Sequence, residues 1–210
     1  MRAEEQEQAA FPQIGSCCKR IAKANVNASM NCESQPAASR LCAACGLCCN
    51  GVMFHTVRLQ PGDSANELAA LGLKLKRKKR QQYILQPCPA WRESRCSIYG
   101  QRPERCRLFE CQQLKRVAAG EITESAALEK IRDVQRRVEH VNELLQRAGG
   151  TNAKKPLSKR CEKIMAEPFD DSSEPAAVEL RAALTQAMHE LDAILDQDFR
   201  IAPGCESAGV

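Results

Sequence analysis

Thirteen cysteines constrain this 210-residue chain more than any other feature of its sequence. Eight of them form two groups: Cys42, Cys45, Cys48 and Cys49, then Cys88, Cys96, Cys106 and Cys111. The first residues lack the apolar stretch of a secretory signal, so we expect a cytoplasmic protein. The cytoplasm keeps thiols reduced, and clustered cysteines there are metal ligands more often than disulfides. The sequence therefore predicts that these eight cysteines hold a metal.

The first group has the pattern CxxCxxCC, in which two residues separate successive cysteines. A tight turn at this spacing brings two sulfurs onto one ion, and a third cysteine at the same interval is typical of bacterial four-iron clusters. Gly46 favours such a turn. Neighbouring side chains diverge, so Cys48 and Cys49 can feed two ions or different corners of one cluster. The eight thiols divide into two four-sulfur sites, or form one cluster with thiols in reserve.

The second group has wider gaps, which suit ligands from successive loops. In one regular helix Cys106 and Cys111 would lie about 140° apart. Either the helix starts after Cys106, or the two cysteines reach different ions. Arg102, Arg105 and Arg107 surround this group, and their donors either bond to thiolates or face solvent.

The other segments predict a mainly α fold. We expect a disordered segment over 1–38, a small irregular metal-binding domain of short helices and loops over 39–118, a long antiparallel helical hairpin over 119–200, and a flexible tail over 201–210. Within 39–118 the sequence predicts a possible extended stretch at 52–59, a helix capped by Asp63 or Ser64, a strand at 82–85 and a helix from Pro103 towards Ala118.

Two apolar stripes at intervals of three and four residues predict the hairpin. The first runs from Leu128 to Leu145, with Thr123 as its cap and Gly149-Gly150 as its stop. After a linker that contains lysines and prolines, Ser173 can cap the second helix, whose stripe runs from Leu180 to Ile194. Such stripes most simply bury one another.

The cysteines and the run Ile98-Tyr99-x-x-Arg102-Pro103-x-x-Cys106-Arg107-x-Phe109-x-Cys111 resemble a known family. This is the CxxCxxCC cysteine-cluster family of the YkgJ type, described as a zinc- or iron-chelating domain. The resemblance covers about residues 40–112. It implies that all eight cysteines belong to a metal site, that the protein is bacterial and cytosolic, and that short helices and loops wrap the metal. A related cluster occurs in flagellin lysine methylases, which are similar to this chain in that segment only.

The ligands leave iron and zinc both open. Four cysteines suit a structural zinc ion as well as a 4Fe-4S cluster, and the three-cysteine loop favours iron slightly. His55 is the one histidine within reach by sequence, and we expect it to be a satisfied or exposed side chain, as we do His140 and His189. The five cysteines outside the motif are expected to be idle surface thiols: Cys17, Cys18, Cys32, Cys161 and Cys205.

The leading functional hypothesis is a structural or redox-sensing metal centre whose helical hairpin binds an unknown protein partner. An iron-sulfur enzyme or enzyme subunit, distantly related to the methylases, is the first alternative. The second is a nucleic-acid binder that uses Lys74–Arg80, although a solvated loop explains this run more simply. The net charge of +5 falls to about +1 if two four-thiolate sites each carry about −2, so charge does not favour nucleic acid. No apolar run is long enough to span a membrane.

Overall fold

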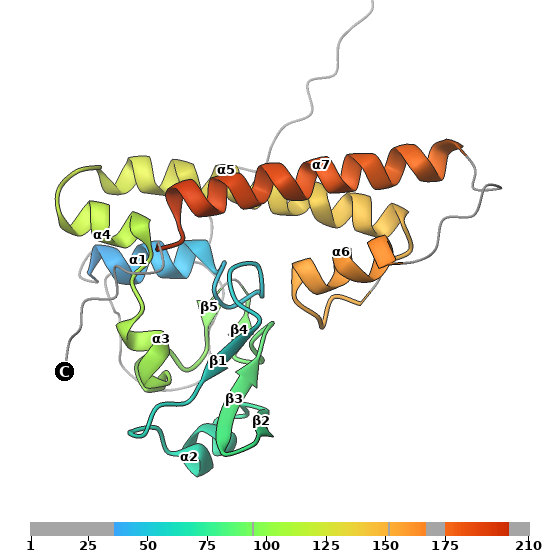
Figure 1. The fold of residues 1–210 in the computed structure, drawn as a ribbon. Helices are drawn as coiled ribbons and strands as arrows, with labels where there is room; N and C mark the ends of the chain where they lie inside the picture. Colours follow the sequence, from blue (N-terminus) through green and yellow to red (C-terminus); the bar gives the residue numbers. More distant parts are fainter. Residues whose placement is uncertain (1–35, 94, 151, 167–174, 202–210) are drawn as a thin grey trace, which may run out of the picture. The chain divides into compact units, whose positions relative to one another are not determined.

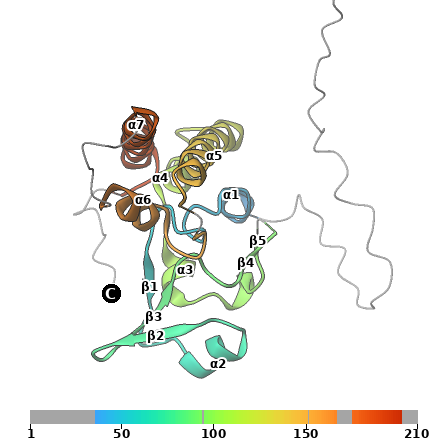
Figure 2. The same cartoon turned by 90° about the vertical axis from the view of Figure 1, so that its right-hand side faces the viewer.

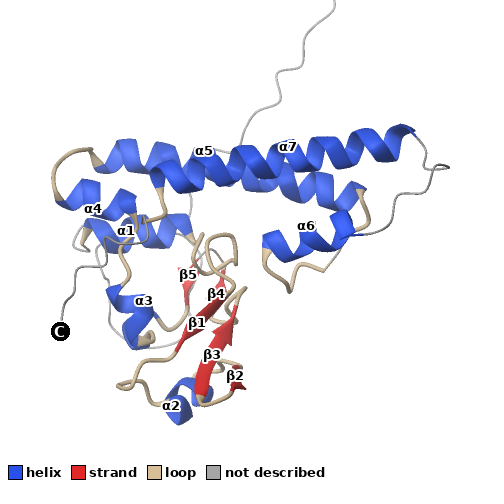
Figure 3. Cartoon of the chain, viewed as in Figure 1, coloured by secondary structure: helices blue, strands red, loops and turns tan. Residues whose placement is uncertain are grey.

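The computed structural model describes residues 36–93, 95–150, 152–166 and 175–201, all of which belong to one compact unit (Figure 1). The expected disordered segment and flexible tail lie outside these residues, apart from residues 36–38 and Ile201. The elements are α1 (Ala37–Cys45), β1 (Thr56–Arg58), α2 (Ala65–Ala70), β2 (Leu75–Lys78), β3 (Gln81–Leu85), β4 (Trp91–Arg92), β5 (Arg95–Cys96), η2 (Tyr99–Gln101), α3 (Glu104–Leu108), α4 (Gln112–Ala118), α5 (Glu124–Arg147), α6 (Leu157–Ala166) and α7 (Pro175–Asp198). The predicted mainly α fold is confirmed (Figure 3).

Helices α5 and α7 pack along one another as the predicted antiparallel hairpin (Figure 1). Lys130 near the start of α5 bonds to Asp198 at the end of α7, whereas Arg137, two turns later, pairs with Glu190. The Thr123 hydroxyl accepts a hydrogen bond from the Ala126 backbone N–H and so caps α5 as expected. The predicted cap Ser173 lies outside the described residues.

The linker between the two long helices contains a further helix, α6, which the sequence reasoning missed. It buries Leu157, Cys161 and Ile164 in the same core as α5 and α7. These three residues follow a helical interval of four and three, but the lysines and the proline around them suggested a linker. The shared apolar face explains why the segment is helical, since tertiary packing supplies most of the stability of a short helix.

One hydrophobic core joins the cysteine-rich segment to the hairpin. Leu41, Leu47, Met53 and Leu114 from the cysteine-rich segment pack with the buried faces of α5, α6 and α7. At the other end of α1, Arg40 Nε donates a hydrogen bond of 2.8 Å to Glu124 of α5. The boundary predicted at residue 118 stays a prediction, but residues on its two sides bury apolar surface against one another.

A small sheet with the order β1-β3-β2 carries a second core, with α2 beside the sheet (Figure 2). All its strands are antiparallel, and α2 covers one of its faces with Leu68 beside Leu59, Leu73 and Ile84. Ser64 caps α2 as predicted, and the predicted strand over 82–85 is part of β3. The extended stretch expected at 52–59 is shorter, at β1.

Two local expectations were wrong. The basic run Lys74–Arg80 is not a solvated loop, because Leu75–Lys78 pairs with β3 and Lys79–Arg80 forms the hairpin turn. The helix expected from Pro103 is two helices, α3 and α4, separated at Phe109. Pro103 is the residue before the first helical position rather than that position itself.

Candidate metal centre

The first cysteine group lies at the end of helix α1 rather than in a loop alone. Cys42 and Cys45 occupy its last turn, three residues apart and therefore on one face. Gly46 then ends the helix with a left-handed backbone (φ 67°), and its N–H bonds to the Cys42 carbonyl. The chain turns back tightly, since the backbone N–H of Cys49 donates to the Gly46 carbonyl at 2.8 Å. The expected turn at Gly46 is thus confirmed.

The second group arrives from two elements and two connecting segments and meets the first. The backbone N–H of Cys88 donates a 2.8 Å hydrogen bond to the Cys49 carbonyl, so the two groups touch directly. Cys96 lies in β5 opposite Trp91 of β4. Cys106 lies within α3, and Cys111 is the residue that precedes α4. The break between α3 and α4 thus separates the directions in which Cys106 and Cys111 enter the site.

Gly46 also lies against Trp91, which stands between Cys88 and Cys96. A Cβ atom added to Gly46 would lie 2.1 Å from Trp91 Cζ2 and 2.6 Å from Cη2, far inside van der Waals contact. Gly46 is therefore required twice, once by its positive φ and once by the indole ring. The turn required at Gly46 was predicted from the sequence. The close approach of Trp91, which lies between Cys88 and Cys96, was not.

Four thiols pack against the large core and influence one another, and we call them the first thiol set: Cys42, Cys45, Cys48 and Cys111. All four pack against the core that includes α5 and α7. The pKa of Cys45 is raised to about 12, mainly by burial; the Leu47 backbone lowers it, and the Cys111 and Cys42 thiols add smaller increases. Burial also raises the pKa of Cys48 well above its ordinary value, followed by the effects of Cys45, Cys111, Cys49 and Cys42.

The remaining four thiols act on one another in the same way and form the second thiol set: Cys49, Cys88, Cys96 and Cys106. Burial raises the pKa of Cys49 to about 12, and Cys88, Cys96 and Cys106 add to the effect. Burial likewise raises the pKa of Cys106 to about 11, with contributions from Cys88 and Cys96. Cys88 and Cys96 pack against the smaller core beside the sheet. Cys48 and Cys49 therefore face different sets, although their mutual influence shows that the sets are neighbours.

The chemistry of both sets suits a thiophilic metal. None of the nine described cysteines is in a disulfide, so all eight thiols of the two sets are free to bind. Eight thiolates this close together and half-buried would repel one another strongly, and a cation removes that cost. Among the described His, Cys, Asp and Glu side chains, no group of three stands close enough around one point to hold an ion as placed.

Arg102 lies between the two thiol sets. Its positive charge lowers the pKa of Cys42 in the first set and of Cys106 in the second, against the larger raising effect of burial. Its guanidinium carbon stacks 3.6 Å from the centre of the Tyr99 ring, and its Nε donates to the Tyr99 carbonyl at 2.9 Å. The Tyr99 hydroxyl in turn bonds to Ser39 of α1 at 3.0 Å. Of the three arginines that surround the second group, Arg102 therefore takes the charge-offsetting role, whereas Arg105 and Arg107 are exposed.

The three histidines and Cys161 are not part of either set. His55 is exposed, and its Nε2 is 2.6 Å from the Ser158 hydroxyl of α6. His140 and His189 are exposed on α5 and α7, as expected. Cys161 is buried in the large core, so the expectation of a surface thiol was wrong there. The other four extra cysteines, Cys17, Cys18, Cys32 and Cys205, lie outside the described residues.

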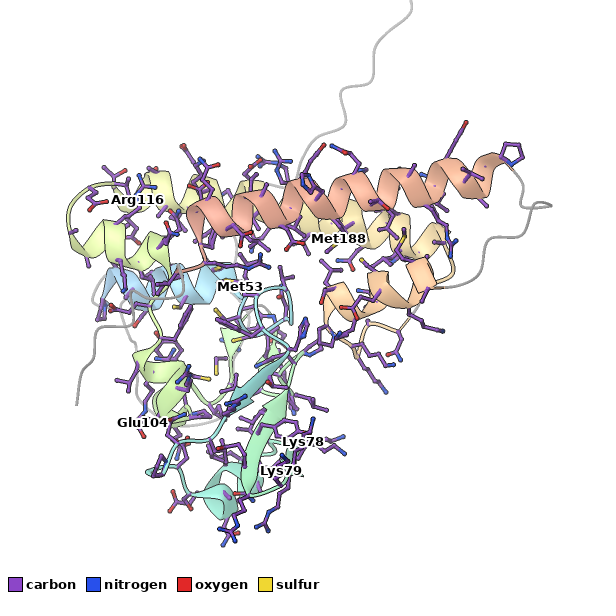
Figure 4. The ribbon with its side chains drawn as sticks, viewed as in Figure 1. Met53, Lys78, Lys79, Glu104, Arg116 and Met188 are labelled. Carbon is purple, nitrogen blue, oxygen red and sulfur yellow. The ribbon has the colours of Figure 1, made fainter. Side chains whose placement is uncertain are left out.

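One further sulfur lies beside the first thiol set. Cys48 Sγ is 4.0 Å from Met53 Sδ, and Met53 is buried on the side of the large core (Figure 4). The contact between Cys48 and Met53 could not be predicted from the sequence, because a methionine five residues after a cysteine is usually an ordinary core residue.

Comparison with known protein families identifies the cysteine-rich part of the chain. Residues 41–133 match the CxxCxxCC family. The family is described as a putative zinc- or iron-chelating domain, so the match supports metal binding, with zinc or iron as the metal. The CxxCxxCC match begins at Leu41, just before the first cysteine, and runs past Cys111 into α5, further than the resemblance read from the motif. No curated protein and no solved structure matches the chain. Within the described parts of the chain, no helix combines the length and apolar character needed to cross a membrane.

Proposed function

We propose that the eight cysteines form two adjacent four-thiolate metal centres that hold iron or zinc in a structural or redox role. The first thiol set would bind one centre and the second set the other. The observation that carries this proposal is the packing of the thiols: Cys42, Cys45, Cys48 and Cys111 lie against the large core, and Cys88 and Cys96 lie against the smaller one. The neighbouring thiols that most raise the pKa of Cys49 are Cys88, Cys96 and Cys106, ahead of Cys42, which supports the same division.

Two centres explain the vicinal pair better than one. Side chains of adjacent residues diverge, so a single ion uses both with difficulty. Here the pair stands at the boundary between the sets, and each member has thiols of its own set nearby. One centre of four thiolates would leave four further half-buried thiols protonated and without a metal.

Because all the donors are sulfur, both zinc and iron are candidates for the metal. Four thiolates suit a closed tetrahedral zinc site, and they suit a 4Fe-4S cluster equally well. Neither set includes a histidine among the described residues. The CxxCxxC part of the first set retains a slight preference for a 4Fe-4S cluster, which would supply electron transfer when bound. Zinc would stabilise the fold without transferring electrons.

We propose that the helical half binds a protein partner. Met165 of α6 and Val178 of α7 are both more than two-fifths exposed, although most bulky apolar residues of these helices are buried. We place the protein in the cytoplasm, because a reducing compartment keeps clustered thiols available to metal.

Metal content tests the two-centre proposal directly. Protein purified without oxygen, then reconstituted separately with zinc and with iron and sulfide, is analysed for metal, for sulfide and for visible absorption. We expect two equivalents of zinc or two clusters per chain. Cys48→Ser and Cys49→Ser should each lose about one centre and retain the other, and the double variant should lose both. Cys161→Ala, which removes a buried thiol outside both sets, is the matched control and should keep full occupancy.

The variants also distinguish the alternatives. A wild-type protein with one centre, or a Cys48→Ser variant that empties both sets while Cys161→Ala stays loaded, would overturn the division. Full occupancy in both single variants would remove the vicinal pair from the site.

A further inference from the structure

One face of the three-stranded sheet carries mostly exposed side chains. Alternate residues of a strand point to the same face, so the pairing of the strands fixes which side chains lie together. Tyr83 of β3 lies opposite Arg58 of β1 on one side and opposite Lys76 of β2 on the other. The same face continues to the pair Lys78 and Gln81. We call these five residues the basic face: Arg58, Lys76, Lys78, Gln81 and Tyr83.

The opposite side of the sheet is the buried side. Ile84 is almost completely buried there, and Leu75 and Val57 pack beside it against the core that α2 covers. On the basic face, by contrast, Arg58, Lys76, Lys78 and Gln81 are exposed and Tyr83 is half-buried. The sheet thus uses one face for its core and presents the other to solvent, as antiparallel sheets commonly do.

The charge of the basic face is uncompensated within the described residues. No Asp or Glu occurs from Leu68 to Arg92, a stretch that includes β2, β3 and their turn. None of Arg58, Lys76 and Lys78 forms an ion pair in the described part of the chain, although arginines and lysines elsewhere pair with carboxylates. Lys79 and Arg80 extend the positive charge into the turn, where Lys78 and Lys79 lie together in Figure 4.

We propose that the basic face binds single-stranded nucleic acid, a function beyond the metal centres. A single strand exposes both its phosphates and the faces of its bases. Lysine and arginine contact the phosphates, and an aromatic ring stacks on a base of any sequence. The row Arg58-Tyr83-Lys76 supplies one ring with a cation on each side. Lys76 and Lys78 lie two residues apart on one strand, about 7 Å, and so can follow a backbone along the sheet.

The pairing of β2 with β3 favours nucleic-acid binding by the run Lys74–Arg80 more than a solvated loop would. A solvated loop would scatter its charges and leave Tyr83 an isolated aromatic residue. The strand instead orders the charges and places the ring between two of them. Other anionic partners fit less well: a duplex hides its base faces, and a membrane surface favours apolar side chains that insert, of which this face offers only Leu85 at its far end.

Fluorescence anisotropy of the full-length, metal-loaded protein tests the proposal. The probes are labelled oligouridylate and oligodeoxythymidylate of about 15 nucleotides, measured between about 50 and 200 mM salt. We expect dissociation constants of about 1 to 100 µM and a salt slope of about −2 to −3.5 for three to five phosphate contacts. Lys76→Gln and Lys78→Gln should each weaken binding and reduce the slope by about 0.7.

Two further variants separate stacking and position from bulk charge. Tyr83→Leu should weaken binding about five- to tenfold with an unchanged salt slope, whereas Tyr83→Phe, which keeps the ring, should bind as the wild type does. Arg77→Gln is the matched control: it removes one exposed charge from the same strand, but Arg77 points to the opposite face. It should bind nearly as well as the wild type. Metal content should stay at the wild-type value in every variant.

Several outcomes would overturn the proposal. Arg77→Gln could weaken binding as much as Lys76→Gln does, which would indicate bulk charge alone. A Tyr83→Leu variant that keeps wild-type metal content and wild-type affinity would remove the stacking role. Absence of binding at the lowest salt, or tighter binding to duplex of the same length or to vesicles of phosphatidylserine and phosphatidylcholine, would also refute it.

Discussion

The contact between Gly46 and Trp91 makes Gly46→Ala the sharpest single test of how the two cysteine groups are joined. The new methyl group would meet two problems at once. It would occupy a left-handed conformation, which costs a residue with a side chain about 1 to 2 kcal/mol. It would also lie 2.1 Å from the indole ring, and relief of such overpacking costs about 1 to 3 kcal/mol. We therefore expect a total destabilisation of about 2 to 5 kcal/mol.

Gly120→Ala separates these two contributions. Gly120 has nearly the same backbone conformation, with φ 72° against 67°, but an added Cβ there meets nothing within 4 Å. Its destabilisation should equal the conformational cost alone, about 1 to 2 kcal/mol. The difference between the two variants then measures the clash with Trp91. Urea unfolding of metal-loaded protein, followed by circular dichroism, gives both values.

Metal content should change in parallel, because the indole ring must move away from α1 and carry the Cys88–Cys96 loop with it. Gly46→Ala should lose part of its metal, and Gly120→Ala should lose none. In a Trp91→Leu background the added methyl group should destabilise the protein less. The double variant should therefore lose less free energy of unfolding than the sum of the two single variants. The reasoning fails if Gly46→Ala costs no more than Gly120→Ala, or if the costs of Gly46→Ala and Trp91→Leu are simply additive.

Three further predictions concern charge, protons and the buried thiol. Arg102→Gln should weaken metal retention against a competing chelator about tenfold, because it removes the charge that favours the thiolates of Cys42 and Cys106, while the exposed Arg107→Gln should leave retention unchanged. Because burial and neighbouring thiols raise the pKa of Cys45 and Cys49 to about 12, these thiols are protonated near neutral pH without metal. Zinc binding should therefore release protons and weaken as the pH falls, which titration in weakly buffered solution with an indicator measures; binding without proton release would contradict it. Cys161→Ser should lower the free energy of unfolding by about 1 to 3 kcal/mol, since it buries a hydroxyl in an apolar core, and an effect on metal content would contradict its exclusion from the site.

Local pattern was sufficient for the elements whose stability is mainly local. The stripes of α5 and α7 and the caps Thr123 and Ser64 were visible, because helix periodicity and capping depend on residues a few positions apart. Only one strand of the β2–β3 hairpin could be predicted from the sequence. Gln82–Leu85 suited a strand by composition, but six basic residues in seven disfavour one, and Lys74–Arg80 is ordered by its pairing with β3 rather than by its own preference.

The candidate site was predictable in membership and not in arrangement. Eight cysteines could be named from spacing, and a division into two sets could be stated as one option. Which cysteine joins which set depends on contacts between segments far apart in the chain, such as the bond from the Cys88 N–H to the Cys49 carbonyl. Spacing within one segment carries no information about that contact. The contact of Trp91 with Gly46 was hidden for the same reason.

The two thiol sets differ in the part of the fold that they stabilise. Leu41, Leu47 and Leu114 lie within three residues of cysteines of the first set, and all three are buried in the core shared with α5 and α7. Metal in the first set should therefore stabilise the helical half. The second set adjoins the sheet core through Cys88 and Cys96, so metal there should order the sheet that carries the basic face. Loss of metal from the first set would then destabilise the helices. Loss of metal from the second set would destabilise the sheet that carries the proposed nucleic-acid surface.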